Sequence, residues 1–221
     1  MRRCLFPLLA LALLGGAPAL RAADVTAVAP ATAASFKEIP ATAAILAEVR
    51  RGGFVLYMRH GSTDNSRADQ FPGLDLADCT TQRVLNDDGR KMATRVGEAI
   101  HKARLPIGEI RVSPLCRTRD TAALAFPGQA AEVDLSLMYT ANLTTAEKAP
   151  ILAKTRELLS TPVAAGSNRL IVAHGPNLMD LIGYFPKEGT LVIFRPQGGQ
   201  RGTSFQYIAS IAPGAWPELL R

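Results

Sequence analysis

The chain has 221 residues, of which 48% are hydrophobic and 20% are charged, with a formal net charge of +6. Once an N-terminal leader is set aside, about 200 residues remain, which is compatible with one domain. The basic residues form no run and are not interleaved with aromatic residues, which argues against a nucleic-acid-binding face.

Residues 1–23 predict a secretory signal peptide. A basic start leads into a short apolar run at residues 5–14, and small residues follow, where cleavage is expected after Ala22 or Ala23. The alternative, a transmembrane anchor, needs about 20 consecutive apolar residues, and two glycines and Pro18 interrupt this run.

Cleavage would remove three arginines (Arg2, Arg3 and Arg21) and no acidic residue, so the formal charge falls from +6 to +3. We expect a periplasmic or secreted protein with no membrane span after cleavage. Its mild positive charge suits an anionic substrate or an anionic envelope surface.

Residues 24–40 are rich in Ala, Thr and Pro and predict a flexible lead-in to a domain at residues 41–221. Apolar residues at helical spacing predict a helix over residues 41–51. A buried parallel strand is then expected at residues 54–58, bounded by glycines.

This strand runs directly into Arg59, His60 and Gly61. The carboxyl ends of strands in an open α/β sheet are where ligands bind. Gly61 lets the chain turn and lets a ligand approach the backbone. We therefore expect Arg59 and His60 to face a binding crevice.

The long connection at residues 62–86 has few apolar residues and contains Pro72 and Gly73. Loops of this length in a compact domain are usually functional or disordered, and we interpret this one as a cover over the site. Thr63 and Ser66 are candidates for binding phosphate; they could equally be ordinary turn hydroxyls. His101, at the far end of an amphipathic helix expected over residues 87–105, is assigned to the surface.

A second strand end follows at residues 110–112. We expect Pro114 in the first turn of the next helix, Ser113 as its cap, and Arg117 beside the free N–H groups of that turn. A third apolar strand, at residues 168–174, ends in His174 and Gly175.

The other elements complete an alternating order of strands and helices. We expect a strand at 132–135, a helix at 144–160 with a Thr144–Glu147 capping box, a short helix at 177–181, and a hairpin of 190–196 with 204–211. This order predicts an α/β fold: a three-layer α/β/α sandwich with a mainly parallel central sheet.

Two guanidinium groups and two imidazoles would converge at these strand ends, which is a suitable set of donors for a phosphate group. The ordered motifs are Arg59-His60-Gly61, then Ser113-Pro114 with Arg117 and Thr121-Ala122, then His174-Gly175. In this order they resemble the histidine phosphatase superfamily, also called phosphoglycerate-mutase-like, branch 1.

The resemblance covers residues 54–211 and implies a metal-independent phosphatase that needs no cofactor. It implies that His60 is the nucleophile that becomes phosphorylated. Arg59, Arg117 and His174 would then hold the phosphoryl oxygens.

The general acid is less clearly indicated. Relatives commonly have a glutamate soon after the third strand, and residues 134–139 contain none. The candidates are Asp64, Asp78, Asp134, Asp180 and Glu188, with Asp64 ranked first because it is closest in sequence to the nucleophile. For each of them a solvated surface acid is the alternative.

Other phosphatase chemistries fit less well. Three histidines, one of them remote, give little support to a binuclear metal site. Ala122 and Leu85 stand where a cysteine phosphatase based on Cys116 or Cys79 would need its arginine.

Cys79 and Cys116 are the two cysteines that remain after the leader is removed. In an oxidising compartment we expect them to form a disulfide, with two separate buried thiols as the alternative. Such a bond would join the cover loop to the helix of Arg117.

Two hypotheses about function remain. The first is a periplasmic phosphomonoesterase, and the second is a non-catalytic anion-binding module of the same fold. Residues 177–196 are similar to a subgroup near the lipopolysaccharide core heptose phosphate phosphatases, which implies a small or envelope-linked sugar phosphate as substrate.

Overall fold

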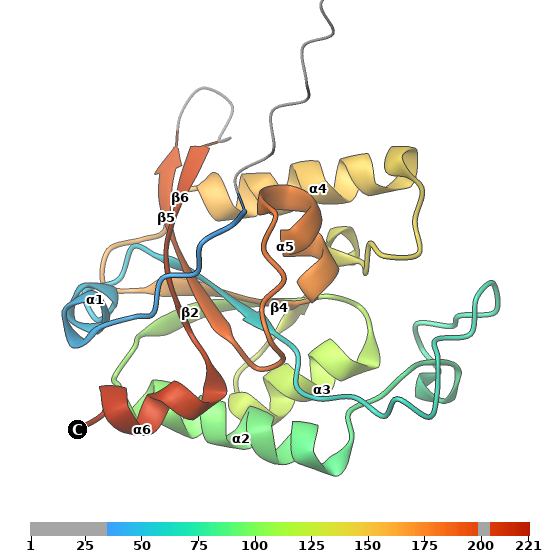
Figure 1. Ribbon diagram of the computed structural model, residues 1–221, viewed down its shortest axis with the longest axis horizontal. Coiled ribbons are helices and arrows are strands. Elements are labelled where there is room, and N and C mark those ends of the chain that lie inside the picture. The colour runs from blue at the N-terminus through green and yellow to red at the C-terminus, as the bar shows by residue number, and fades with distance from the viewer. Residues whose placement is uncertain (1–34, 199–203) are drawn as a thin grey trace, which may run out of the picture. The chain divides into compact units, whose positions relative to one another are not determined.

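The computed structural model describes residues 35–198 and 204–221. The predicted signal peptide and residues 24–34 of the predicted lead-in lie outside the described residues. Six strands form one sheet in the order β3-β2-β4-β1-β5-β6 (Figure 1). Their bounds are β1 Val55–Arg59, β2 Ile107–Val112, β3 Glu132–Val133, β4 Asn168–Ala173, β5 Leu191–Gly198 and β6 Ser204–Ile211.

Helices cover both faces of this sheet, which confirms the predicted three-layer α/β/α fold. The helices are α1 Ala43–Val49, α2 Asp87–Lys102, α3 Cys116–Ala125, α4 Thr145–Ser160, α5 Gly175–Ile182 and α6 Trp216–Leu219. One apolar core joins α1, α2, α3 and α6 to the sheet, and a second joins α4 and α5 to its other face. Figure 1 shows α4 and α5 on the opposite side of the sheet from α2 and α3.

β1 lies inside the sheet, where it pairs with β4 in parallel and with β5 in antiparallel orientation. Its side chains alternate between the two cores, with Leu56 and Met58 in one and Val55 and Tyr57 in the other. The strand is therefore buried on both faces, which explains its uninterrupted apolar sequence. Because β2 and β4 run parallel to β1, their carboxyl ends meet at the same edge of the sheet.

The hairpin of β5 and β6 is confirmed, and so is the capping box at the start of α4, where Thr144 and Glu147 bond reciprocally. β3 is shorter than the strand predicted at residues 132–135. It ends at Val133 because Asp134 caps a 3-10 helix, η2 (Leu135–Leu137), by accepting from the N–H of Ser136.

The expectations that Ser113 caps the following helix and that Pro114 lies in its first turn are both wrong. α3 begins at Cys116, its N-cap is Leu115, and no side chain caps it. The Ser113 hydroxyl instead bonds the Nε2 atom of His174, 2.7 Å away. Arg117 nevertheless lies in the first turn of α3, as predicted.

The end of the predicted flexible lead-in packs against the sheet. The Ser210 N–H donates to the Ile39 carbonyl at 2.8 Å, the Ala41 N–H donates to the Ser210 carbonyl at 3.0 Å, and Phe36 stacks on Tyr184. Within the described ranges, the structure has no helix that is both long enough and apolar enough to cross a bilayer.

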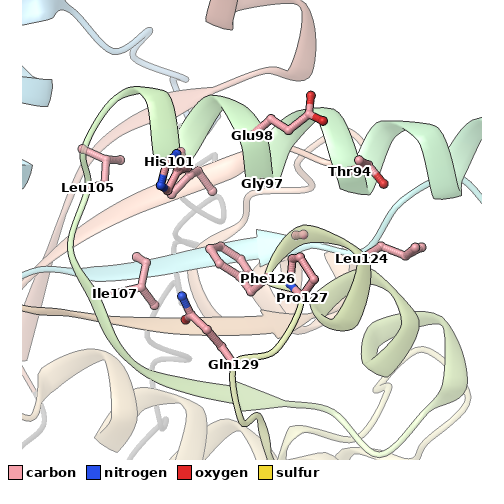
Figure 2. Close-up of a pocket in the computed structure, with 12 residues that line it drawn as sticks. Thr94, Gly97, Glu98, His101, Leu105, Ile107, Leu124, Phe126, Pro127 and Gln129 are labelled. Carbon is pink, nitrogen blue, oxygen red and sulfur yellow. The ribbon is translucent and has the colours of Figure 1, made fainter.

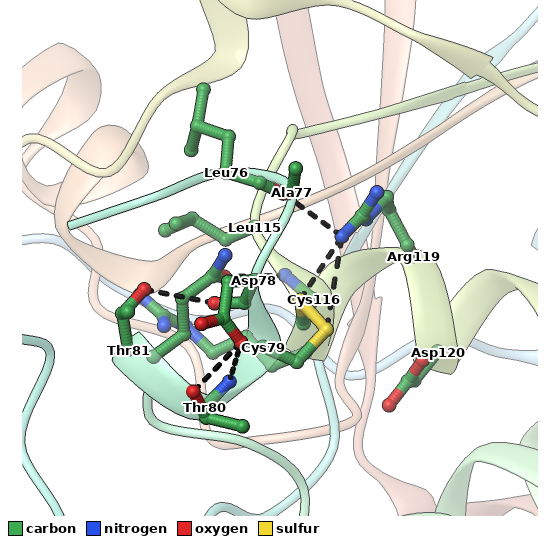
Figure 3. Close-up of a disulfide and its surroundings, with 12 residues drawn as sticks. Leu76, Ala77, Asp78, Cys79, Thr80, Thr81, Leu115, Cys116, Arg119 and Asp120 are labelled. Atoms are coloured by element: carbon green, nitrogen blue, oxygen red, sulfur yellow. Dashed lines mark hydrogen bonds between the residues drawn. A yellow bond between two sulfur atoms is a disulfide. The ribbon is translucent and has the colours of Figure 1, made fainter.

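Residues 62–86 lead from the end of β1 to α2 and lie against the start of α3 (Figure 1). A disulfide joins Cys79, in the 3-10 helix η1 (Cys79–Thr81), to Cys116, the first residue of α3 (Figure 3). The Cys116 N–H also donates to the buried Gln82 side chain at 2.8 Å. We refer to residues 62–86 as the cover loop.

The turn after His60 packs backbone to backbone against the first turn of α2. A Cβ at Gly61 would lie 2.5 Å from the Gly89 carbonyl oxygen, and one at Gly89 would meet the Ser62 backbone. A side chain at either position would push the cover loop away from α2. The glycines therefore fix where the chain leaves His60.

Candidate active site

His60 lies directly after β1 and is 1% exposed. Its Nδ1 atom is 2.8 Å from the Gly61 carbonyl oxygen. A carbonyl only accepts, so Nδ1 carries the hydrogen and Nε2 keeps its lone pair. Burial, and then the positive charge of Arg117, hold the pKa of His60 well below 6.5. The imidazole is thus neutral near pH 7, which is the form needed for nucleophilic attack.

His174 is the N-cap of α5 and is also fully buried. The Tyr57 hydroxyl donates to its backbone carbonyl at 2.8 Å and accepts from its N–H at 3.0 Å. Its Nε2 atom bonds the Ser113 hydroxyl, and burial holds its pKa well below 6.5. The ring centroids of His60 and His174 are 5.4 Å apart, so the structure brings the two predicted histidines together.

Arg117 has no exposed side-chain surface, although it carries a charge. Its Nη1 donates to the Asp69 carboxylate at 2.9 Å and to the Arg83 carbonyl at 3.3 Å. Its guanidinium lies 5.2 Å from the centre of the Tyr139 ring, which in turn packs edge-on against His174. One edge of the guanidinium is held by the cover loop, while Nε and Nη2 have no partner among the described residues.

Arg59, the last residue of β1, is also held in place, in its case by residues that follow α5. Its Nη1 donates to the Pro186 carbonyl at 2.7 Å, its Nη2 is 3.5 Å from the Glu188 carboxylate, and its guanidinium stacks over Phe185. Its Nε atom is buried without a partner among the described residues. Burial is the main cause that lowers the pKa of both Arg59 and Arg117.

The unpartnered buried atoms concentrate in the predicted site. Of seven such side-chain atoms in the described part of the chain, five belong to four predicted phosphate-binding residues: Arg59 Nε, Thr63 Oγ1, Arg117 Nε, Arg117 Nη2 and His174 Nδ1. Buried polar groups without a partner are costly, each by roughly 1–3 kcal/mol. A ligand rich in acceptor oxygens, such as a phosphoryl group, would satisfy them.

Ser66 is not brought to this site. It is exposed, and its hydroxyl and N–H both donate to the Asp64 carboxylate, at 2.7 and 2.9 Å. These bonds lower the pKa of Asp64. A lowered pKa works against a general acid, which must hold its proton until the leaving group needs it.

The other acid candidates differ in where they lie. Asp78 and Asp134 cap the 3-10 helices η1 and η2, and Asp180 bonds Thr140 and Lys148. Within the described residues, Glu188 is the one of the five candidates that contacts Arg59.

Asp69 and Arg83 are site residues that the sequence analysis missed. Asp69 accepts from Arg117, and the Arg83 carbonyl contacts Arg117 as well. Both lie in a long irregular loop without periodicity, where no sequence signal separates them from other polar residues. Tyr57 was seen only as an apolar strand residue, although its hydroxyl positions His174.

One hollow in the described part of the chain lies apart from the predicted site residues, and another lies beside Arg59. One, of about 400 Å³, lies between α2 and the end of α3 and is lined by His101, Leu105, Phe126 and Gln129 among others, none of them a predicted site residue (Figure 2). The other is an open groove of about 740 Å³ lined by Arg59, Ser62, Lys187 and Glu188 among others. This groove opens beside Arg59.

The comparisons with known proteins concern the family and the fold. The model of the histidine phosphatase superfamily (branch 1) matches residues 55–138. This range includes Arg59, His60 and Arg117, while His174 lies beyond it. A search of curated proteins finds no match.

Several solved structures are similar to this chain, some of them with TM-scores above 0.5. A candidate alpha-ribazole-5'-P phosphatase from Escherichia coli has a TM-score of 0.54 and 15% identity, covering 73% of this chain and 98% of its own. A mycobacterial glucosyl-3-phosphoglycerate phosphatase, solved with inorganic phosphate, has a TM-score of 0.51 and 18% identity, covering 73% and 99%. The protein histidine phosphatase SixA, solved with tungstate, has a TM-score of 0.48 and 17% identity, covering 73% and 97%.

At these identities the structural likeness concerns the fold, and the family match concerns the sequence of the first two motifs. The match supports a phosphatase. Together these findings confirm the resemblance to the histidine phosphatase superfamily, branch 1, to which the sequence motifs point.

Proposed function

We propose that this protein is an exported phosphomonoester hydrolase that works through a phosphohistidine on His60. The observation that carries the proposal is the group of unpartnered buried donors beside a neutral imidazole. A phosphoryl group placed there would meet donors from Arg59, Arg117, His174 and Thr63.

In the proposed reaction, Nε2 of His60 attacks phosphorus and the bond from phosphorus to the ester oxygen breaks. The ester oxygen leaves with its electron pair and takes up a proton. Water then attacks the phosphohistidine and gives up a proton, which restores the proton donor of the first step; the N–P bond breaks, and inorganic phosphate is released while His60 regains its lone pair. The fixed guanidinium groups stabilise the charge on the transferring group in both steps.

Glu188 is the best-placed proton donor among the acids named from sequence, because it lines the groove beside Arg59. A general acid matters most for a poor leaving group. Glu188→Gln should therefore slow hydrolysis of alkyl phosphates more than hydrolysis of p-nitrophenyl phosphate. An equal loss for both substrates would remove Glu188 from this role.

The proposed location is the periplasm or the exterior, and the proposed substrate is a small or envelope-linked sugar phosphate. The predicted signal peptide and the Cys79–Cys116 disulfide support export. The open groove beside Arg59 supports a small polar leaving group. A panel of heptose and hexose phosphates, nucleotides, phytate and 3-phosphoglycerate tests the substrate class, and a preference for either of the last two would contradict it.

Turnover of p-nitrophenyl phosphate by the mature protein tests the activity itself. We expect hydrolysis by the wild type and none by His60→Ala, while the surface variant His101→Ala should match the wild type. Phosphate binding without hydrolysis would instead favour a non-catalytic anion-binding module.

A further inference from the structure

Arg83 is held at the site by its own backbone. Its N–H donates to the Asp69 carboxylate at 2.8 Å, and its carbonyl accepts from Arg117 Nη1 at 3.3 Å. The same carboxylate oxygen accepts from Arg117. Both peptide groups of Arg83 are therefore bonded to the ion pair that orients the phosphate-binding guanidinium.

The neighbours of Arg83 are fixed as well. The Gln82 side chain is buried and accepts from the first N–H of α3, and the Val84 carbonyl accepts from Asp64. The disulfide at Cys79 joins the same stretch to α3. The segment around Arg83 is thus anchored to α3 beside Arg117.

The side chain of Arg83 differs from those of Arg59 and Arg117. Each of those two guanidinium groups contacts a carboxylate, whereas the Arg83 guanidinium makes no ion pair or hydrogen bond within residues 35–198 and 204–221. It is half-buried rather than enclosed. Burial is the main cause that lowers the pKa of His60, His174, Arg59 and Arg117, and the positive charge of Arg83 is a smaller cause for all four.

A transferring phosphoryl group already has buried donors available from Arg59, Thr63, Arg117 and His174. Arg83 is a further, half-buried cation outside that set, and its backbone bonds to Asp69 and Arg117 hold it at the edge of the site. The leaving-group part of a substrate occupies the rim while the phosphoryl group occupies the interior. An unpaired guanidinium there fits a carboxylate or a second phosphate, which it can bind bidentately.

We propose that Arg83 forms a second anion subsite, so that the favoured substrates are sugar phosphates whose leaving group carries another phosphate, such as sugar bisphosphates. This inference rests on the proposed phosphatase function and narrows its substrate class.

Kinetics on scaffold-matched substrates test the proposal. Glucose 6-phosphate and glucose 1,6-bisphosphate are compared for the wild type, Arg83→Gln and Arg83→Lys, with Arg95→Gln as a control for the lost charge. Arg95 is an exposed residue of α2. Thermal unfolding checks that each variant is folded.

We expect Arg83→Gln to lower kcat/KM for the bisphosphate by about 10- to 100-fold, mainly through KM, since a charge-assisted contact is lost. The loss for glucose 6-phosphate should be at least several-fold smaller, and Arg83→Lys should retain part of the preference. Equal losses on both substrates, no loss, or the same loss in Arg95→Gln would overturn the second subsite.

A binding measurement separates failure of this inference from failure of the proposed function. Calorimetry with inorganic phosphate and with methylenediphosphonate needs no turnover. The wild type should bind the diphosphonate more tightly, and Arg83→Gln should remove that difference while still binding phosphate. If the protein hydrolyses nothing yet shows this pattern, the subsite stands and the phosphatase proposal fails. If diphosphonate binding is unaffected by Arg83→Gln, the subsite is overturned.

Discussion

Replacing Asp69 by Asn tests whether the cover loop is an integral part of the site. The Asp69 carboxylate, 6% exposed, lies 2.9 Å from a guanidinium with no exposed surface. Asparagine keeps the size and one acceptor but removes the charge, so Arg117 is left buried without its counter-ion. Breaking a buried ion pair by removing one partner typically costs about 3–5 kcal/mol.

We expect Asp69→Asn to lower the free energy of unfolding by about 3 kcal/mol, because the Asn oxygen can still accept from the Arg83 N–H. Urea unfolding at pH 7.5 measures this value. Asp78→Asn is the matched control: it makes the same chemical change on the same loop, at an exposed cap of η1 where asparagine is also a good cap.

Inorganic phosphate sharpens the test, because an anion that binds only the folded protein stabilises it by mass action. Phosphate should recover part of the stability lost in Asp69→Asn by pairing with Arg117. The reasoning is refuted if Asp69→Asn and Asp78→Asn change the unfolding free energy by the same small amount. It is also refuted if a double-mutant cycle with Arg117→Met shows no coupling between the two side chains.

Three further predictions concern the site and its surroundings. Arg117→Lys should lower kcat/KM on p-nitrophenyl phosphate by about 100-fold or more, because lysine cannot present the Nε–Nη2 edge to two phosphoryl oxygens; wild-type-like kinetics would remove Arg117 from the phosphate site. The free energy of unfolding should fall on acidification below about pH 6.5, by up to about 1.4 kcal/mol per pH unit for each of His60 and His174. The reason is that these imidazoles bind protons in the unfolded chain but stay neutral when buried in the folded protein. Equal urea midpoints at pH 7.5 and 5.0 would contradict this. Thiol titration of the denatured, unreduced mature protein should find no free thiols, and reduction should destabilise the fold by ~4 kcal/mol for a sequence separation of 37; two free thiols would contradict the disulfide.

The arrangement of strand ends could be predicted from sequence because it follows from topology. Short apolar runs that end in Arg59-His60 and in His174 indicated buried parallel strands, and such strands place their carboxyl ends together. The capping box of Thr144 and Glu147 is a local rule that the structure obeys. The pairing of Cys79 with Cys116 could be expected because they are the two cysteines that lie outside the predicted signal peptide.

The contacts that complete the site could not be predicted in this way. Ser113 had the residue type and position of a helix cap, yet its hydroxyl bonds His174 across the sheet edge. Asp69 is one of several aspartates in the cover loop, and only the folded path of that loop brings it to Arg117. Asp64, the nearest acid in sequence to His60, pairs instead with Ser66. Tertiary contacts of irregular segments leave no periodic pattern in a single sequence.

The central claim is that His60 accepts the phosphoryl group. It is tested most directly by rapid mixing of the mature protein with substrate, an alkaline quench that preserves phosphohistidine, and mass spectrometry of the intact protein and its peptides. The account predicts one phosphoryl group per protein, located on His60, formed as fast as turnover and absent from His60→Ala. Phosphate on any other residue of the active protein, or turnover that persists in His60→Ala, would contradict it.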